Sequence, residues 1–371
     1  MHIDEELSGK SNSTISEIKK CINNKELIHF DICDTENNYI QKNGLRALVD
    51  DLLPITKEIS NRKFLRATKT NILDLNVLEL VKKFEEKNVR YIVFKGYALS
   101  KSIYSDPNNR PYADIDLIID PGQKRDVIKI LNDLNYINPY DRDYSFTRGQ
   151  IVRRKELTPH KIFLELDVHF YMIGNFILRD LYDFGELYNN RITFYVKDTK
   201  ILTLSKTHRF IHCCIHYYLH NKKRDLIKDI WLYDIKLMID NFEPKEVKKV
   251  IDAIEEHKLG LIIVEVLTEV NMNFIINNSV LEVFLNEMDC NSDIYKLKNT
   301  SVLSIYIKQL NKIHGLNNKF AFIYDTTIPD YKLLCLKYGK FNKLIYPIYL
   351  LIRCFNVTYD YGTRFTHNKS K

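Results

Sequence analysis

Residues 94–119 read FKGYALSKSIYSDPNNRPYADIDLII, and this stretch decides the fold. It begins at the end of an apolar run, residues 89–94, that is typical of a buried strand. Lys95 and Gly96 close that strand, a helix is expected over residues 97–104, and the loop SDPNNRP is rich in turn-forming residues. Residues 113–120 alternate polar and apolar side chains, which predicts a half-buried strand. The stretch therefore predicts a strand, a short helix and a second strand.

The segments on either side extend this pattern into an α+β fold. Upstream, helical spacing is present around residues 15–25, 45–62 and 73–87. Downstream, a helix is expected over 124–134 and strands over 163–170 and 192–196, and the chain is helical in pattern from about residue 204. We expect a small mixed β-sheet with flanking helices, plus an all-helical C-terminal half. The expected division is a helical N-terminal extension (1–71), a core with the sheet (72–200) and a helical domain (201–371).

Carboxylates gather on one face of the two alternating strands. Side chains two residues apart on a strand share a face, so Asp114 and Asp116 project together. The same spacing puts Glu165, Asp167 and His169 on one face of the strand 163–170. If the two strands are neighbours, Asp167 approaches the Asp114/Asp116 pair. Three close carboxylates repel each other unless cations neutralise them, which predicts a site for Mg²⁺, as two ions, or for Mn²⁺.

A phosphate-binding site is expected beside these carboxylates. Lys95 and Gly96 lie where a strand ends and a helix begins, and a helix N-terminus favours an anion. Lys95 can supply a point charge to a triphosphate, and Arg110 can supply a forked one. A single Asp-x-Asp pair or a single Lys-Gly turn is common on solvated surfaces. The ordered combination of all these residues is much more specific.

The same residues resemble the signature of a family of uncharacterised nucleotidyltransferases of bacterial biosynthetic clusters, in the DNA polymerase β-like superfamily. Leu166–His169 is similar to a later Val-Asp-Leu-His feature, and the helical part resembles the family at His216, His220 and Asp234. The resemblance covers residues 72–240. Within the signature, it is carried by Lys95, Gly96, Ala98, Leu99, Tyr104, Asp106, Pro107, Arg110, Pro111, Asp114, Asp116 and Leu117.

The resemblance implies an enzyme that transfers a nucleoside monophosphate from an NTP, ATP included, to an acceptor hydroxyl or phosphate, with release of pyrophosphate. Asp114, Asp116 and Asp167 are the expected catalytic and metal-binding residues, and residues 72–200 become the nucleotidyltransferase core. The expected nucleotide-binding residues are Lys95, Gly96, Ser100, Arg110 and His216. Ser100 enters because the superfamily's usual Gly-Ser is Gly96-Tyr97 here, which leaves open the hydroxyl that contacts the triphosphate.

The sequence does not identify the acceptor of the nucleoside monophosphate. A small molecule or biosynthetic intermediate is the first expectation. RNA or tRNA, a protein side chain, and a catalytically silent nucleotide-binding module are the alternatives. No recognition of DNA sequence is expected.

Four histidines, His208, His212, His216 and His220, recur every four residues on one expected helix. This spacing can form a pair of metal ligands. A cleft lined by His216 and ordinary packing are the other two interpretations.

The remaining composition limits the class of protein. The seven cysteines form no Cys-x-x-Cys pair, no long apolar span is present, and the first residues lack an apolar signal region, so a cytoplasmic protein is expected. The net charge is +7, and residues 301–371 hold nine Lys and two Arg against three Asp. The basic, aromatic stretch 331–353 is a candidate contact for an anionic acceptor or a membrane surface, or an ordinary packed helix with solvated lysines.

Overall fold

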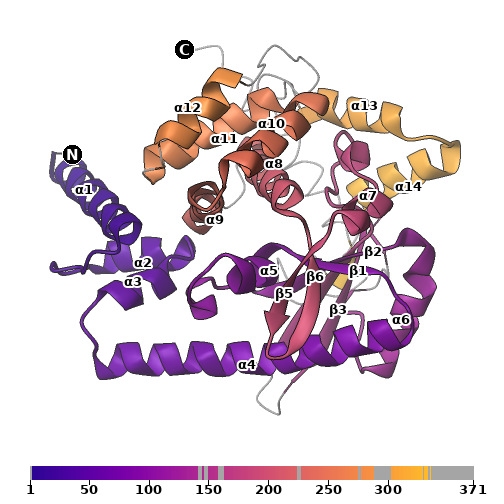
Figure 1. Cartoon of the computed structure of the whole chain (residues 1–371), viewed down its shortest axis with the longest axis horizontal. Helices are drawn as coiled ribbons and strands as arrows, with labels where there is room; N and C mark the ends of the chain where they lie inside the picture. Colours follow the sequence, from indigo (N-terminus) through magenta and orange to yellow (C-terminus); the bar gives the residue numbers. More distant parts are fainter. Residues whose placement is uncertain are drawn as a thin grey trace.

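The structure is a computed structural model of the 371-residue chain (Figure 1). It describes residues 2–140, 144–145, 149–157, 163–223, 227–274, 276, 278–287, 302–328, 330–332 and 335. The strands are β1 (Tyr91–Phe94), β2 (Asp114–Ile119), β3 (Gln150–Glu156), β4 (Phe163–His169), β5 (Ile192–Val196) and β6 (Thr199–Thr203). The short 3-10 helices are η1 (Pro107–Asn109), η2 (Pro121–Gln123) and η3 (Arg179–Leu181). The α-helices are α1 (His2–Asn24), α2 (Asp34–Lys42), α3 (Arg46–Leu52), α4 (Lys57–Glu86), α5 (Lys95–Ser102), α6 (Lys124–Asp133), α7 (Phe184–Asn189), α8 (Lys206–Lys223), α9 (Asp229–Asp240), α10 (Pro244–Glu256), α11 (Gly260–Asn273), α12 (Asn278–Glu287), α13 (Val302–Lys312) and α14 (Leu316–Thr327).

The six strands form one mixed sheet in the order β3-β4-β2-β1-β6-β5. β2 runs parallel to β4 and antiparallel to β1, and β1 runs parallel to β6. β3 and β5 lie at the two edges, each antiparallel to its neighbour. β2 and β4, which carry the candidate carboxylates, are therefore adjacent in the interior of the sheet.

Each face of the sheet packs on a different hydrophobic core. On one face, Ile115, Leu117 and Ile119 of β2 are buried in a cluster with apolar residues of α4 and α6. On the other face, Ile92 and Ile118 join a larger cluster formed mainly by helices of the C-terminal half. Figure 1 shows this layering, with α4 and α6 below the sheet and α8–α12 above it. The face that carries Asp114 and Asp116 therefore turns toward the helical half.

The predicted α+β fold and its mixed sheet are confirmed, as are the strands expected at 89–94, 113–120, 163–170 and 192–196. The single helix expected over 45–62 is wrong, because the chain forms α3 and α4 with a break at residues 53–56. Pro54 accounts for the break, since proline lacks a backbone N–H and disfavours helical geometry at the residue before it. Leu53 is accordingly extended, with φ −96° and ψ 152°. Thr56 then caps α4 by accepting a hydrogen bond from the Ile59 N–H at 3.2 Å.

The N-terminal helices pack into the same core as the C-terminal half. Ile18, Ile40 and Val49 belong to the cluster that contains α8, α9 and α11. Lys19 reinforces this packing, because its ammonium lies 2.7 Å from a carboxylate oxygen of Asp229. The boundary expected between residues 71 and 72 falls inside α4.

None of the helices in the described part of the chain combines the length and the apolar character needed to cross a membrane. The basic stretch 331–353, apart from residues 331, 332 and 335, lies outside the described residues.

Candidate active site

The pairing of β2 with β4 brings the candidate carboxylates together. Asp116 stands opposite Asp167 in the register of these two parallel strands, and Asp114 stands opposite Glu165. On the other side of β2, Asp116 is paired with Phe94, the last residue of β1. The three aspartates predicted from strand alternation therefore lie on one patch of the sheet.

Lys95 is the cation that the chain itself places at this patch. Its Nζ lies 2.6 Å from Asp116 Oδ1 and 3.1 Å from His169 Nε2. His169 Nε2 is also 3.0 Å from the same Asp116 oxygen, so its ring either donates a proton there or accepts one from Lys95. Lys95 has a left-handed backbone with φ 56°, which is uncommon for a residue with a side chain and typical of functional sites. This strained turn at the end of β1 places the ammonium between Asp116 and His169.

The electrostatics separate Asp116 from the other two aspartates. Burial alone would raise the pKa of Asp116, but Lys95 and His169 together outweigh it and hold that pKa below its ordinary value. Burial, with the charge of Asp116 added, raises the pKa of Asp114 to about 6. Burial and the charges of Asp116 and Asp114 raise the pKa of Asp167 to about 7. Two of the three carboxylates thus lack sufficient positive charge nearby, which is the condition that a bound cation relieves.

The donor atoms fit a divalent cation. Asp116, Asp167 and His169 each offer a ligand atom, and these atoms lie within 4.8 Å of one another. Asp167 Oδ1 is buried and accepts no hydrogen bond from any described residue, while its Oδ2 is 3.4 Å from Gln150 Nε2. Buried carboxylate oxygens are rarely left without a partner, so this oxygen is suited to metal coordination. The two carboxylates suit Mg²⁺ or Mn²⁺, whereas an imidazole ligand is more typical of Zn²⁺ or iron.

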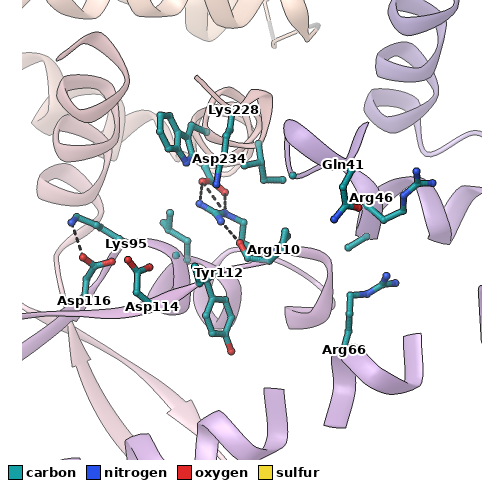
Figure 2. A pocket seen from close by; sticks show the side chains of 18 of the residues that line it. Gln41, Arg46, Arg66, Lys95, Arg110, Tyr112, Asp114, Asp116, Lys228 and Asp234 are labelled. Carbon is teal, nitrogen blue, oxygen red and sulfur yellow. Dashed lines mark hydrogen bonds and ion pairs between the residues drawn. The ribbon is translucent and has the colours of Figure 1, made fainter. Parts of the chain in front are cut away.

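A cavity of about 690 Å³ opens beside the carboxylates (Figure 2). Its lining includes Asp114, Asp116 and Lys95 on the sheet side and His216 and Trp231 on the helical side. This volume lies in the range of pockets that hold a ligand of nucleotide or drug size.

Arg110 lines the cavity, but its guanidinium is committed to a buried partner. Its Nε and Nη2 donate to Asp234 at 2.8 Å each, and its Nη1 donates to the Pro111 carbonyl. Asp234 also accepts a 2.7 Å hydrogen bond from the Tyr104 hydroxyl. Figure 2 shows this pair in the middle of the cavity wall. The arrangement ties the loop before β2 to α9.

Gly96 and Ser100 have local structural partners. A Cβ added to Gly96 would lie 2.8 Å from the Cβ of Tyr112, so the absence of a side chain allows Tyr112 to pack against the start of α5. Gly96 still lines the cavity. Ser100 is fully buried and donates to the Tyr97 carbonyl at 2.7 Å. It is not among the described residues that form the cavity lining.

Three of the four helix histidines gather near the cavity. His212 and His216 line it with stacked rings, and His216 and His220 both contact the ring of Trp231. Burial, with the charge of Lys95 added, lowers the pKa of His212 to about 3, so its ring is neutral at pH 7. His212 and His216 therefore form a polar but uncharged part of the lining.

His208 lies apart from the other three. Its Nδ1 is 3.0 Å from Ser205 Oγ, and its ring packs against Tyr182. Among the described residues, the group of potential metal ligands contains none of the four.

Comparison with known proteins assigns the chain to a family. A family profile described as "Uncharacterised nucleotidyltransferase" matches residues 39–301, well over half of the chain. The chain belongs to this family. The resemblance seen in residues 94–119 is thereby confirmed, and the chain is a nucleotidyltransferase by family. Among solved structures, this nucleotidyltransferase is similar to an antigenic nucleotidyltransferase-like protein from Paracoccidioides brasiliensis, with 18% sequence identity and a TM-score of 0.36, over 57% of this chain and 97% of that chain. A comparison with curated proteins finds no match.

Sequence reasoning overlooked several residues of the candidate site. It placed His169 on the carboxylate face but gave it no role, and it did not single out Trp231. The alternation of strand 163–170 was the available signal for His169, whereas the position of Trp231 depends on how α9 packs against α8. It also gave no role to the basic residues of α3 and α4 that line the cavity.

Proposed function

We propose that the chain transfers a nucleoside monophosphate from an NTP to an acceptor hydroxyl or phosphate and releases pyrophosphate, in a reaction that depends on Mg²⁺ or Mn²⁺. The observation that carries this proposal is the register of Asp116 with Asp167, beside Asp114, together with an Asp167 Oδ1 that accepts no hydrogen bond within the described part of the chain. Divalent cations bound there would neutralise phosphate charge and activate the attacking oxygen.

Each side chain of the site has a distinct proposed task. Asp114, Asp116 and Asp167 hold the divalent ions, and His169 orients Asp116 through its 3.0 Å contact. Lys95, already within 2.6 Å of Asp116, contributes positive charge beside the phosphates. Asp167 is also the proposed acceptor of the proton from the attacking group, through the carboxylate oxygen that is not bound to the metal. The neutral rings of His216 and Trp231 line the part of the cavity that would receive the base.

Calorimetry of NTP binding tests the proposal. Wild-type protein is titrated with each of the four NTPs, with and without Mg²⁺, alongside Asp116→Asn and Glu165→Gln. Glu165 is the matched control, because it lies on the same strand face but pairs with Arg154 at 2.7 Å and does not line the cavity. We expect Mg²⁺-dependent binding of one nucleotide in the wild type and in Glu165→Gln, and binding weaker by about tenfold or more in Asp116→Asn.

Two results would contradict the proposal. If Asp116→Asn keeps its fold by circular dichroism and binds NTP with Mg²⁺ as tightly as wild type, the carboxylates take no part in NTP binding. Tight binding by the wild type, without pyrophosphate release in the presence of candidate acceptors, would favour a silent nucleotide-binding module.

A further inference from the structure

The end of the cavity away from the carboxylates is strongly basic. Figure 2 shows Arg46 and Arg66 on one side of the Arg110–Asp234 pair, with Asp114 and Asp116 on the other. The basic residues that line the cavity, other than Lys95 and Arg110, are here called the basic wall; they are Lys42, Arg46, Arg62, Arg66, Lys69 and Lys228. All except Lys228 come from α2, α3 and α4, and Lys228 immediately precedes α9.

A buried carboxylate organises the two central arginines of the basic wall. Asp50 has a fully buried side chain, and it accepts from Arg62 Nη2 at 2.7 Å and from Arg66 Nη1 at 2.6 Å. One carboxylate therefore positions two guanidinium groups. Arg66 Nε is buried and has no hydrogen-bond partner among the described residues. Asp50 thus holds both arginines in place, while the Arg66 Nε–H group stays available to donate a hydrogen bond.

The basic wall carries more positive charge than its own partners neutralise. Lys42, Lys69 and Lys228 form no ion pair within the described part of the chain. Within the described residues, the acidic side chains that line the cavity are Asp114, Asp116 and Asp234, and Asp234 is paired with Arg110. Clustered like charges repel one another, and a concave surface of one sign concentrates ligands of the opposite sign. The cavity therefore has a carboxylate end suited to cations and a basic end suited to an anion.

The origin of the basic wall indicates which substrate it serves. The carboxylates lie on β2 and β4 and Lys95 begins α5, and these elements belong to the sheet core. The basic wall instead lies on α2, α3 and α4 and, at Lys228, just before α9, all outside the sheet. Its Arg46 and Arg66 lie across the Arg110–Asp234 pair from Asp114 and Asp116 in Figure 2. In-line transfer needs donor and acceptor on opposite sides of the phosphorus atom. A single cavity with two chemically different ends meets this need.

We propose that the basic wall binds the phosphate groups of a phosphorylated acceptor, an inference that rests on the proposed function. The acceptor presents its hydroxyl or phosphate oxygen to the carboxylate end, while a second phosphate is held by the arginines and lysines of the basic wall. The oxygen attacks the α-phosphorus of the NTP, the bond between that phosphorus and the bridging oxygen breaks, and pyrophosphate leaves with the bonding electrons. The proton of the attacking group passes to a carboxylate of the site.

Exposed lysines give a test that leaves the fold intact. The triple variant Lys42→Gln/Lys69→Gln/Lys228→Gln removes three charges that stabilise no described ion pair. The matched control Lys82→Gln/Lys200→Gln/Lys248→Gln removes three exposed lysines that do not line the cavity. Lys82 lies on the same helix as Lys69 but about 20 Å farther along it, at 1.5 Å per residue. Equal melting temperatures would verify both folds.

The readout is the fluorescence of Trp231, the one tryptophan of the chain, during titration with inorganic phosphate in EDTA. We expect the triple variant to bind phosphate about tenfold more weakly than wild type, and the control to match wild type. Phosphate should still bind wild-type protein saturated with Mg²⁺ and a non-hydrolysable NTP, because the two sites are separate. Mg²⁺-dependent NTP binding should survive in the triple variant.

Two results would overturn the inference. Unchanged phosphate affinity in the triple variant would mean that the basic wall is not the anion site. Loss of both phosphate and NTP binding in the triple variant, with the NTP displacing phosphate from wild type, would assign the basic wall to the triphosphate of the donor. Asp116→Asn separates this inference from the proposed function: it should lose NTP binding and keep phosphate binding. If it keeps both, the proposed function fails while the basic wall stands.

Discussion

Lys95 shows how one residue determines the electrostatics of the site. Its ammonium neutralises Asp116, which is only 3% exposed, and it leaves Asp114 and Asp167 with raised pKa values. The sequence predicted a cation for the triphosphate at this position. The structure adds that the same cation already pairs with a proposed metal ligand. Lys95 and a divalent ion should therefore substitute for one another as the counter-charge of Asp116.

Replacement of Lys95 tests this exchange. Lys95→Met should destabilise the protein in EDTA by about 1–3 kcal/mol, between the values for exposed and buried pairs, because Lys95 is partly exposed. Mg²⁺ should then raise the melting temperature of this variant more than that of wild type. The control is Lys101→Met on the same helix, which breaks the buried pair of Lys101 with Asp74 at 2.6 Å. It should also be destabilised, but without extra recovery in Mg²⁺. Equal recovery in both variants would contradict the exchange.

The limits of sequence reasoning are clear at individual residues. Alternation with a period of two is a local property, so it placed Asp114 and Asp116 on one face and Asp167 on another strand's face without any knowledge of pairing. The left-handed φ of Lys95 has no sequence signature. The partner of Arg110 lies 124 positions away at Asp234, and only the packing of α9 against the sheet core brings them together.

Elements built from local patterns were recognised, and those built from tertiary pairing were not. β2, β4 and β5 alternate and were predicted, whereas β3 reads QIVRRKE and places polar residues on both faces. β3 exists because all seven of its residues pair with β4 at the edge of the sheet. β6, with only five residues, is likewise specified by its pairing with β1 and β5.

The Arg110–Asp234 pair is the contact between elements that most directly shapes the cavity. Arg110→Met alone should cost about 3–5 kcal/mol, because it leaves Asp234 buried without a counter-charge. The double variant Arg110→Met/Asp234→Met should recover most of that loss, since buried ion pairs are often replaceable by apolar residues. Urea denaturation of the single and double variants measures both values.

The double variant also separates two roles of Arg110. Because all three of its nitrogen groups already donate to protein oxygens, Mg²⁺-dependent NTP binding by a stable double variant should stay close to wild type. An affinity loss of about tenfold or more would show instead that Arg110 contacts the triphosphate, as the sequence predicted.

For the whole molecule, the N-terminal helices share a hydrophobic core with helices of the C-terminal half. The sequence left this open, because the apolar faces of short helices do not reveal which core they enter. Ile40 of α2 and Ile262 of α11 are both fully buried in one cluster. Gly44 lies so close to α9 that an added Cβ would be 3.0 Å from Ile230. The basic wall is consequently fixed relative to α9, whose Trp231 and Asp234 also line the cavity.

This shared core predicts a single unfolding transition for the N-terminal helices and the helices α8, α9 and α11. Ile40→Ala and Ile262→Ala should each cost about 2–5 kcal/mol, as buried isoleucine truncations do. Each should shift the same thermal transition, followed by circular dichroism and by the fluorescence of Trp231. If the N-terminal helices instead formed an independent unit, Ile40→Ala would move an early transition and leave the later one in place. A common shift would show that the helices of the basic wall and the helices α8 and α9 fold together. A substrate bound at either group of helices would then stabilise the other.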